Sequence, residues 1–258
     1  MKITILGSGT STGVPEIGCT CPVCTSTDPR DRRWRCSGLI ETQGVRILVD
    51  CGPDFREQMM RYATFAPLDA VLVTHEHYDH VGGLDDLRPF TRFRDVPVYA
   101  EAYMAEHLRA RIPYCFTETL YPGVPRITLN EIAPFQPFSL LSAEGKSVEI
   151  LPIRVLHGEL PILGYRIGRM AWITDMLTMP EESFEALHGL DVLVMNALRP
   201  QPHRTHQSVS EALEKAARIG ARETYFVHMS HHIGRHAEAE QTLPPHIHFA
   251  YDGLTLTL

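Results

Sequence analysis

The chain has 258 residues, of which 44% are apolar and 21% charged, an ordinary composition for a globular protein with a buried core. Its formal net charge of −7 argues against a general affinity for the nucleic-acid backbone. No stretch approaches the ~20 apolar residues of a membrane span, and the N-terminal apolar run is too short for a secretory signal, so we expect a cytoplasmic protein whose cysteines are reduced or metal-bound.

Short apolar runs bounded by turn residues predict strands in the first half of the chain. These runs are Ile3–Leu6, Leu39–Thr42, Val45–Val49 and Ala70–Thr74. Gln43-Gly44 has the composition of a hairpin turn between the second and third strands. Helical patterns follow at Pro53–Tyr62 and Ala102–Ile112.

The second half of the chain repeats this alternation. Strands are expected at Ser147–Leu156, Leu163–Ile167, Met170–Thr174, Asp191–Met195, Glu223–Val227 and within Phe249–Leu258, and helices at Pro180–His188 and Val209–Ile219. The chain contains no internal repeat and no convincing linker. This order predicts an α/β fold with four αββα layers, in which two mixed sheets pack face to face with helices outside, as one domain over residues 1–258.

Residues 75–80 (His-Glu-His-Tyr-Asp-His) directly follow an apolar run and concentrate metal-binding side chains. Imidazole and carboxylate groups suit first-row divalent ions such as zinc and manganese. Because alternate side chains of an extended strand end share one face, His75 and His77 can bind the same ion. Asp79 and His80 lie on the turn beyond and can point toward a second ion. The alternative is a polar junction whose histidines only satisfy one another.

Polar side chains also end three later apolar strands. His157 follows a largely apolar run, and Asp175 and His228 do the same further along the chain. Alone, each histidine would be read as an ordinary buried residue, but reactive groups often occupy the loops at one rim of a sheet. Together with the first cluster they give seven candidate ligands, enough for two ions that share a carboxylate: His75, His77, Asp79, His80, His157, Asp175 and His228.

Cys19, Cys21 and Cys24 have a spacing that allows three thiolates to bind one tetrahedral zinc ion. The fourth ligand must then come from a distant part of the chain. A disulfide is the rival interpretation, but a reducing compartment disfavours it and one cysteine would be left over; unligated thiols are the third. A structural zinc would order the loop at about residues 18–25.

The histidines and aspartates of the predicted metal site resemble those of the metallo-β-lactamase fold hydrolases. The resemblance implies that His75, His77 and His157 bind one ion, that Asp79, His80 and His228 bind the other, and that Asp175 bridges them. The retained His80 and Asp175 favour the hydrolytic branches with two metals. Two cations roughly 3.5–4 Å apart can lower the pKa of a bridging water, so that hydroxide attacks an anionic ester at neutral pH.

A more specific resemblance comes from residues 7–15 (Gly-Ser-Gly-Thr-Ser-Thr-Gly-Val-Pro), which lead into the cysteine cluster, and from Cys36-Ser37-Gly38 after it. Both resemble PhnP-type phosphodiesterases, a branch related to the tRNA 3′-processing ribonucleases. The resemblance implies that His231 closes the structural zinc site. It also implies catalytic roles for Asp79 and His206, whose imidazolium can bind a phosphoryl oxygen or protonate a departing alkoxide.

Three further expectations concern the surroundings of the site. His203 is a less good match than His206, and we predict that it is not the catalytic histidine. The glycine-rich segment 7–13 is expected to be a turn that brings backbone close to the metals, because no clear helix follows it as in a dinucleotide site. Residues 85–93 and 114–121 are expected to border the substrate pocket.

These features predict a dinuclear metal-dependent phosphodiesterase that hydrolyses small or cyclic phosphodiesters, with a ribosyl 1,2-cyclic phosphate as the substrate that the resemblance suggests. It would carry two zinc or manganese ions and one structural zinc, and act on a small molecule without a nucleic-acid or membrane partner; the resemblance also favours a homodimer. A tRNA 3′-processing endoribonuclease is the alternative, although the chain lacks a long glycine- and proline-rich arm. A thioester hydrolase or lactamase does not explain the cysteines. In a non-catalytic metal-binding scaffold we would expect some of the seven ligand positions to be lost.

Overall fold

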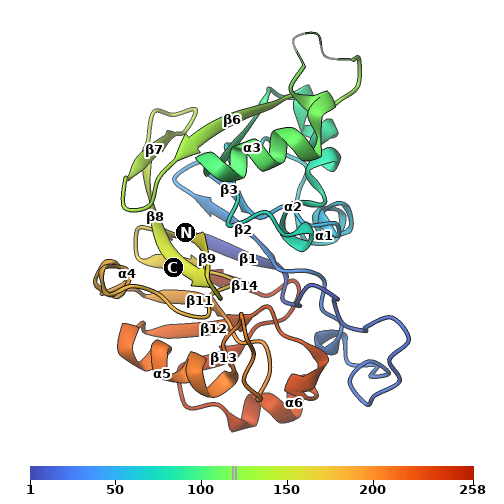
Figure 1. Ribbon diagram of the computed structural model, residues 1–258, viewed down its shortest axis with the longest axis vertical. Helices are drawn as coiled ribbons and strands as arrows, with labels where there is room; N and C mark the ends of the chain where they lie inside the picture. Colours follow the sequence, from blue (N-terminus) through green and yellow to red (C-terminus); the bar gives the residue numbers. More distant parts are fainter. Residues whose placement is uncertain (118, 120) are drawn as a thin grey trace.

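The computed structural model describes residues 1–117, 119 and 121–258. Over these residues the strands form two seven-stranded sheets that pack face to face, with α1–α3 on one outer side and α4–α6 on the other (Figure 1). The predicted αββα layering is confirmed. That the whole chain is a single domain stays a prediction.

The first sheet begins antiparallel and continues parallel. Its strands lie in the order β14 (Thr255–Thr257), β1 (Lys2–Gly7), β2 (Ser37–Thr42), β3 (Val45–Val49), β4 (Ala70–Leu72), β5 (Val96–Glu101) and β6 (Ile127–Ile132). The pairs from β14 to β3 are antiparallel, and those from β3 to β6 are parallel.

The second sheet has the same mixed character. Its strands lie in the order β13 (Ile247–Phe249), β12 (Glu223–Val227), β11 (Val192–Asn196), β10 (Met170–Ile173), β9 (Leu160–Ile167), β8 (Ser147–His157) and β7 (Phe138–Leu141). The pairs from β10 to β13 are parallel, so these strands end at the same edge of the sheet.

Helices and short turns connect these strands. The α-helices are α1 (Phe55–Tyr62), α2 (Tyr78–Val81), α3 (Ala102–Arg111), α4 (Glu181–Ala186), α5 (Val209–Ile219) and α6 (His236–Ala239). The 3₁₀ turns are η1 (Pro29–Asp31), η2 (Leu84–Arg92), η3 (Pro113–Cys115), η4 (His231–Ile233) and η5 (Glu240–Thr242). None of the helices among the described residues is both long and apolar enough to cross a bilayer.

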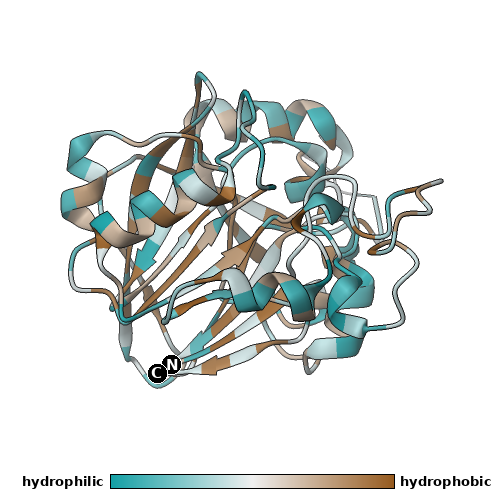
Figure 2. Cartoon of the chain, turned by 90° about the horizontal axis from the view of Figure 1, so that it is seen from below, coloured by the Kyte–Doolittle hydropathy of each residue, from teal (hydrophilic) through white to brown (hydrophobic). Residues whose placement is uncertain are grey.

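Apolar side chains fill three layers. One cluster lies between the sheets and includes the fully buried Tyr165 and Trp172. Two others lie between a sheet and its outer helices, and Figure 2 shows the apolar strands running through the interior. Because both faces of each sheet are covered, the central strands are almost continuously apolar in sequence, as in β3 and β11.

Local sequence fixes the ends of α5, which follows the loop that carries His206. The Ser208 side chain accepts from the backbone N–H of Glu211 while the Glu211 carboxylate accepts from the Ser208 N–H, a complete capping box. Gly220 ends the helix in the left-handed conformation (φ 69°) that favours glycine. The predicted helix Val209–Ile219 is therefore confirmed to the residue.

Four strands have no counterpart among the sequence predictions: β5, β6, β7 and β13. Pro97 lies inside β5 and obscured the alternation of its buried and half-buried residues. The other three lie at or next to the sheet edges and carry mixed polar and apolar residues, so their pattern is weak.

Candidate metal centre

All seven side chains predicted as ligands converge where strands of both sheets end. His157 is the last residue of β8, Asp175 follows β10 by two residues, and His228 directly follows β12. His75 follows β4 by three residues. Because parallel strands end at the same edge, residues far apart in the sequence meet in one pocket.

His75, His77 and His157 form the first group of ligand atoms within 4.8 Å of one another. His75 Nε2 lies 3.0 Å from His77 Nδ1. The Nδ1 atom of His75 lies 3.0 Å from the Thr74 hydroxyl, and that of His157 donates to the Thr205 carbonyl at 2.9 Å. These bonds leave the Nε2 lone pairs of His75 and His157 for an ion.

Asp79, His80, Asp175 and His228 form the second group, and all four are buried. Asp79 and His80 lie on the short helix α2, rather than on the turn that the sequence suggested. Asp79 Oδ2 lies 3.2 Å from His80 Nε2 and 3.3 Å from His228 Nε2. One carboxylate oxygen therefore faces two imidazole nitrogens across a space that suits a cation.

Asp175 lies between the two groups. Its Oδ2 atom is 3.0 Å from Nε2 of both His80 and His228, and 3.6 Å from Nε2 of His75. Its other oxygen, Oδ1, is buried and has no hydrogen-bond partner among the described residues. A buried carboxylate with one orphaned oxygen, placed between two sets of imidazoles, fits a bridging ligand of two ions.

The electrostatics of the pocket favour cations. Burial opposes the charge of His80, but Asp175, Asp79 and Asp50 raise its pKa well above the usual range. His75 faces fewer carboxylates, and burial lowers its pKa. Buried carboxylates need a compensating positive charge, which bound divalent ions would supply together with the residues present.

Asp50 belongs to the site but was missed in the sequence. It directly follows β3, is fully buried, and its Oδ2 lies 2.7 Å from His80 Nδ1. Its other oxygen accepts the Thr74 backbone N–H at 2.8 Å. Asp50 thus fixes His80 with Nδ1 protonated and Nε2 free for an ion. The sequence pattern that identifies Asp50 was present, because this carboxylate follows an apolar strand just as Asp175 does.

His206 lies directly beside both groups. Its ring centroid is 4.4 Å from that of His157 and 4.9 Å from that of His228. A nitrogen of His206 also falls within 4.8 Å of ligand atoms of His157 and Asp175. Burial lowers the pKa of His206 to about 3, and Nδ1 has no partner among the described residues. The imidazole is therefore placed to act on a group bound at the metal site.

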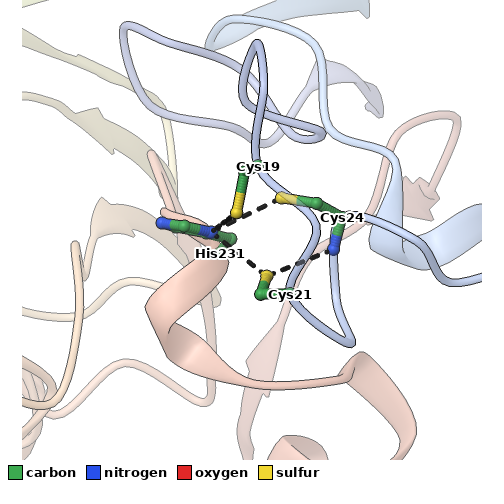
Figure 3. Close-up of side chains that lie close together, drawn as sticks. All are labelled: Cys19, Cys21, Cys24 and His231. Carbon is green, nitrogen blue, oxygen red and sulfur yellow. Dashed lines mark hydrogen bonds between the residues drawn. The ribbon is translucent and has the colours of Figure 1, made fainter.

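The cysteine loop meets the predicted fourth ligand, as Figure 3 shows. The Sγ atoms of Cys19 and Cys21 lie 3.3 Å from His231 Nδ1, and that of Cys24 lies 3.4 Å from it. Sulfur and nitrogen at ~2.3 and ~2.0 Å from a tetrahedral zinc are roughly 3.5 Å apart. Donation by the Cys24 N–H helps to lower the pKa of Cys21 to about 6, which favours the thiolate. The four side chains fit a zinc ion; that they bind one stays a prediction.

Arg33 connects the loop before the cysteines to the turn that carries His231. Its side chain is buried and donates to the Ser230 carbonyl at 3.1 Å. Its backbone exchanges two hydrogen bonds with Val14, at 2.7 and 2.8 Å. Both halves of the cysteine–histidine cluster are thereby fixed to one arginine.

The glycine-rich segment lies close to the metal centre, as expected. Thr10 N–H donates to the carbonyl of Met229, the residue after His228. Gly9 passes so close to the neighbouring chain that a Cβ there would lie 2.7 Å from the Arg33 carbonyl oxygen. No side chain can be accommodated at that approach. Of the segments expected to border the pocket, residues 118 and 120 lie outside the described part of the chain.

The sequence profile of the beta-lactamase superfamily domain matches residues 45–229. A PhnP-family diphosphatase of known crystal structure is 40% identical and superposes with a TM-score of 0.90, covering 99% of this chain and 96% of that one. The Zn²⁺-bound PqqB of Methylobacterium extorquens is 21% identical with a TM-score of 0.76 over 100% of both chains, which shows the shared fold.

The octanoyltransferase of Porphyromonas gingivalis is 48% identical over 256 residues, 98% of this chain and 51% of that protein. The chain therefore spans about half the length of this relative.

Proposed function

Because the chain belongs to the metallo-β-lactamase superfamily, and within it to the PhnP family, we propose that it is a dinuclear metal-dependent hydrolase of small phosphodiesters or diphosphates. Both substrate classes contain an anionic phosphoryl group whose leaving group departs through an ester or anhydride oxygen. The cyclic ribosyl phosphate expected from the sequence belongs to the first class. The diphosphatase activity named for the 40% identical relative favours the second.

The observation that supports this proposal best is the position of Asp175. Its Oδ2 atom lies within 3.0–3.6 Å of imidazole nitrogens from both ligand groups. His75, His77 and His157 would hold one ion, Asp79, His80 and His228 would hold the other, and the Asp175 carboxylate would contribute to both. When bound, such ions lower the pKa of coordinated water and neutralise phosphoryl oxygens.

The protein's own contribution is to orient the ligands and to place a proton donor. Thr74, Thr205 and Asp50 hold three imidazoles by their Nδ1 atoms, so that Nε2 points into the pocket. His206 is neutral when the site holds no anion, since burial lowers its pKa. An anionic phosphoryl group beside the ring would favour the imidazolium, which can bind a phosphoryl oxygen or protonate the leaving oxygen.

Three alternatives compete with this function. An endoribonuclease of the tRNA 3′-processing type would use the same ligands, and the net charge of −7 is unfavourable for it. Octanoyl transfer is the activity named for a protein about twice as long as this chain, so the name does not assign that activity to the half that this chain matches. A non-catalytic metal-binding scaffold would bind ions without turnover.

The test compares substrates on protein reconstituted separately with zinc and with manganese. Bis(p-nitrophenyl) phosphate, a cyclic ribosyl phosphate, a dialkyl diphosphate and pre-tRNA are assayed, with Asp175→Ala as the control. We expect at least one small diester or diphosphate to turn over, Asp175→Ala to be inactive, and pre-tRNA to stay intact. Cleavage of pre-tRNA alone would support the endoribonuclease, and inactivity toward all substrates would support the scaffold.

A further inference from the structure

Asn196 is the last residue of β11, and its side chain is fully buried. The parallel pairing of β10 with β11 ends at Ile173 and Met195. Beyond this pair the chain leaves the ladder and carries Asp175 into the metal centre. The next residue, Met176, is also fully buried, so its backbone N–H and carbonyl need hydrogen-bond partners outside the ladder.

The side chain of Asn196 supplies both of these partners. Its Oδ1 atom accepts from the Met176 N–H at 2.7 Å, and its Nδ2 atom donates to the Met176 carbonyl at 2.9 Å. An asparagine side chain presents a donor and an acceptor side by side, as a peptide group does. The amide therefore extends the ladder by one residue and fixes both peptide groups of Met176, which is bonded to Asp175.

The Asp175 carboxylate depends on its backbone for its position. Its Oδ1 atom has no hydrogen-bond partner among the described residues. Its Oδ2 atom faces His80 and His228, which are themselves candidate ligands. The carboxylate therefore has to be held by the chain on either side of it, which is β10 on one side and Met176 on the other.

The backbone around Asn196 is fixed to two further segments of the site. Gln207 Nε2 donates to the Asn196 carbonyl at 2.5 Å, and Gln207 directly follows His206. The N–H of the residue after Asn196 donates to the Val227 carbonyl at 3.0 Å, and Val227 directly precedes His228. The amide that holds the Asp175 segment is thus anchored beside the proposed proton donor and a candidate metal ligand.

We propose that Asn196 is a positioning residue that holds the Asp175 carboxylate between the two metal positions through the backbone of Met176. The inference rests on the two-metal centre of the proposed function. It differs from the role of Asp50, which orients a ligand of only one of the two ions.

Two variants remove this hydrogen bonding to different extents. Asn196→Leu keeps a side chain of similar length and leaves both the N–H and the carbonyl of Met176 without a partner. Asn196→Asp keeps the acceptor but sets an oxygen against the Met176 carbonyl. Loss of a residue that supports a metal ligand lowers metal affinity about 10–100-fold. Because Asp175 would contribute to both ions, we expect both affinities to fall together by about this factor in Asn196→Leu.

The test measures metal binding directly. Apoprotein is titrated with zinc in competition with a chromophoric chelator, and the manganese-loaded protein is examined by electron paramagnetic resonance. Two manganese ions that share a bridging ligand give an exchange-coupled signal, which we expect to change in Asn196→Leu. A role in stability alone would move neither measurement in the folded protein.

Ser142→Ala is the matched control. The buried Ser142 hydroxyl accepts from the Lys146 N–H at 3.0 Å, at the opposite end of β8 from His157. This variant also removes a buried hydrogen bond from a side chain to the backbone, and it should keep both zinc affinities and the manganese signal. If Asn196→Leu does not fold, Asn196→Asp is measured in the same way.

The outcomes separate this inference from the function on which it rests. Wild-type zinc affinities in the folded Asn196 variant, a loss at only one of the two positions, or an equal loss in Ser142→Ala would overturn the role of Asn196. If both affinities fall in the variant but wild-type protein hydrolyses no phosphodiester or diphosphate, the proposed activity fails and the positioning role stands. If wild-type protein binds fewer than two ions at this centre, both fail.

Discussion

Asp50 holds His80 by a 2.7 Å hydrogen bond between Oδ2 and Nδ1, in a position where neither side chain is exposed. The other Asp50 oxygen is occupied by the Thr74 backbone N–H, so the carboxylate cannot turn away. This pair decides which nitrogen of His80 faces the metal centre. The orientation of a candidate ligand thus depends on a residue whose two carboxylate oxygens face His80 and the Thr74 N–H.

Asp50→Asn should weaken the second metal position. An amide must present its NH₂ either to His80 Nδ1 or to the Thr74 N–H, so it either forces the wrong histidine tautomer or sets two donors against each other. We expect metal affinity at one of the two positions to fall about 10–100-fold, measured by titration of apoprotein with zinc. Asp69→Asn, which removes a carboxylate that instead accepts the Arg46 N–H, is the control. Equal affinities in both variants would contradict the role of Asp50.

His206→Ala should slow turnover and leave bound metal unchanged. General acid catalysis contributes about 10²–10⁴-fold, and we expect kcat to fall within this range on a dialkyl phosphodiester, whose alkoxide leaving group needs a proton. Metal content by mass spectrometry is the second measurement, because a His206 nitrogen also lies within reach of His157 and Asp175. A variant that loses one ion would show that His206 is a ligand instead.

Cys24→Ser should remove one zinc ion and leave the two-metal centre occupied. The cysteine loop has a small apolar cluster of its own around Val14 and Val23, so the zinc is expected to contribute much of its order. We predict one fewer zinc per chain, a lower unfolding temperature and faster proteolysis within residues 16–27. Cys115→Ala, which changes a buried thiol elsewhere, should keep all the metal. Unchanged zinc content in Cys24→Ser would refute the structural site.

The convergence of the candidate ligand side chains could be predicted because they share one simple property. His157, Asp175 and His228 each interrupt an apolar strand at its end, and such positions meet at one edge of a sheet. Asp50 obeys the same rule and could have been found by applying it to β3. Which nitrogen of each histidine faces the pocket could not be predicted, because the Thr205 carbonyl that holds His157 is a backbone atom of a distant loop.

The fourth member of the cysteine cluster shows a different limit. His231 is more than two hundred residues from Cys19, and only the family resemblance pointed to it. Arg33, which ties the two segments together, lies in a stretch of arginines at residues 30–35, a composition typical of an exposed segment, yet its side chain is fully buried. Edge strands such as β7 and β13 were not predicted, because few of their residues pack in a core and their sequence pattern is therefore weak.

Asp252 should make the stability of the fold depend on pH. Asp252 lies between β13 and β14, is half-buried, and its carboxylate accepts from Ser8 N–H and Oγ–H at 2.8 and 2.7 Å and from Trp34 N–H at 2.7 Å. Burial outweighs these donors and raises the pKa of Asp252 from 3.8 to about 7. The folded state therefore holds a proton that the unfolded state has already released between pH 4 and 7.

This difference in bound protons decides whether the free energy of unfolding rises or falls with pH. Stability is greatest below the unfolded pKa and falls as pH rises through the folded pKa, by up to about 4 kcal/mol for this one group. Asp252→Asn cannot titrate and sets an NH₂ against the Trp34 N–H, so it should be less stable than wild type at low pH. We expect the difference in unfolding free energy between wild type and Asp252→Asn, measured by urea titration at fixed zinc concentration, to become smaller from pH 4.5 to 7.5. Metal binding also changes with pH, but both variants share that change. If this difference in unfolding free energy stays constant or grows with pH, the three donors keep Asp252 ionised despite its desolvation.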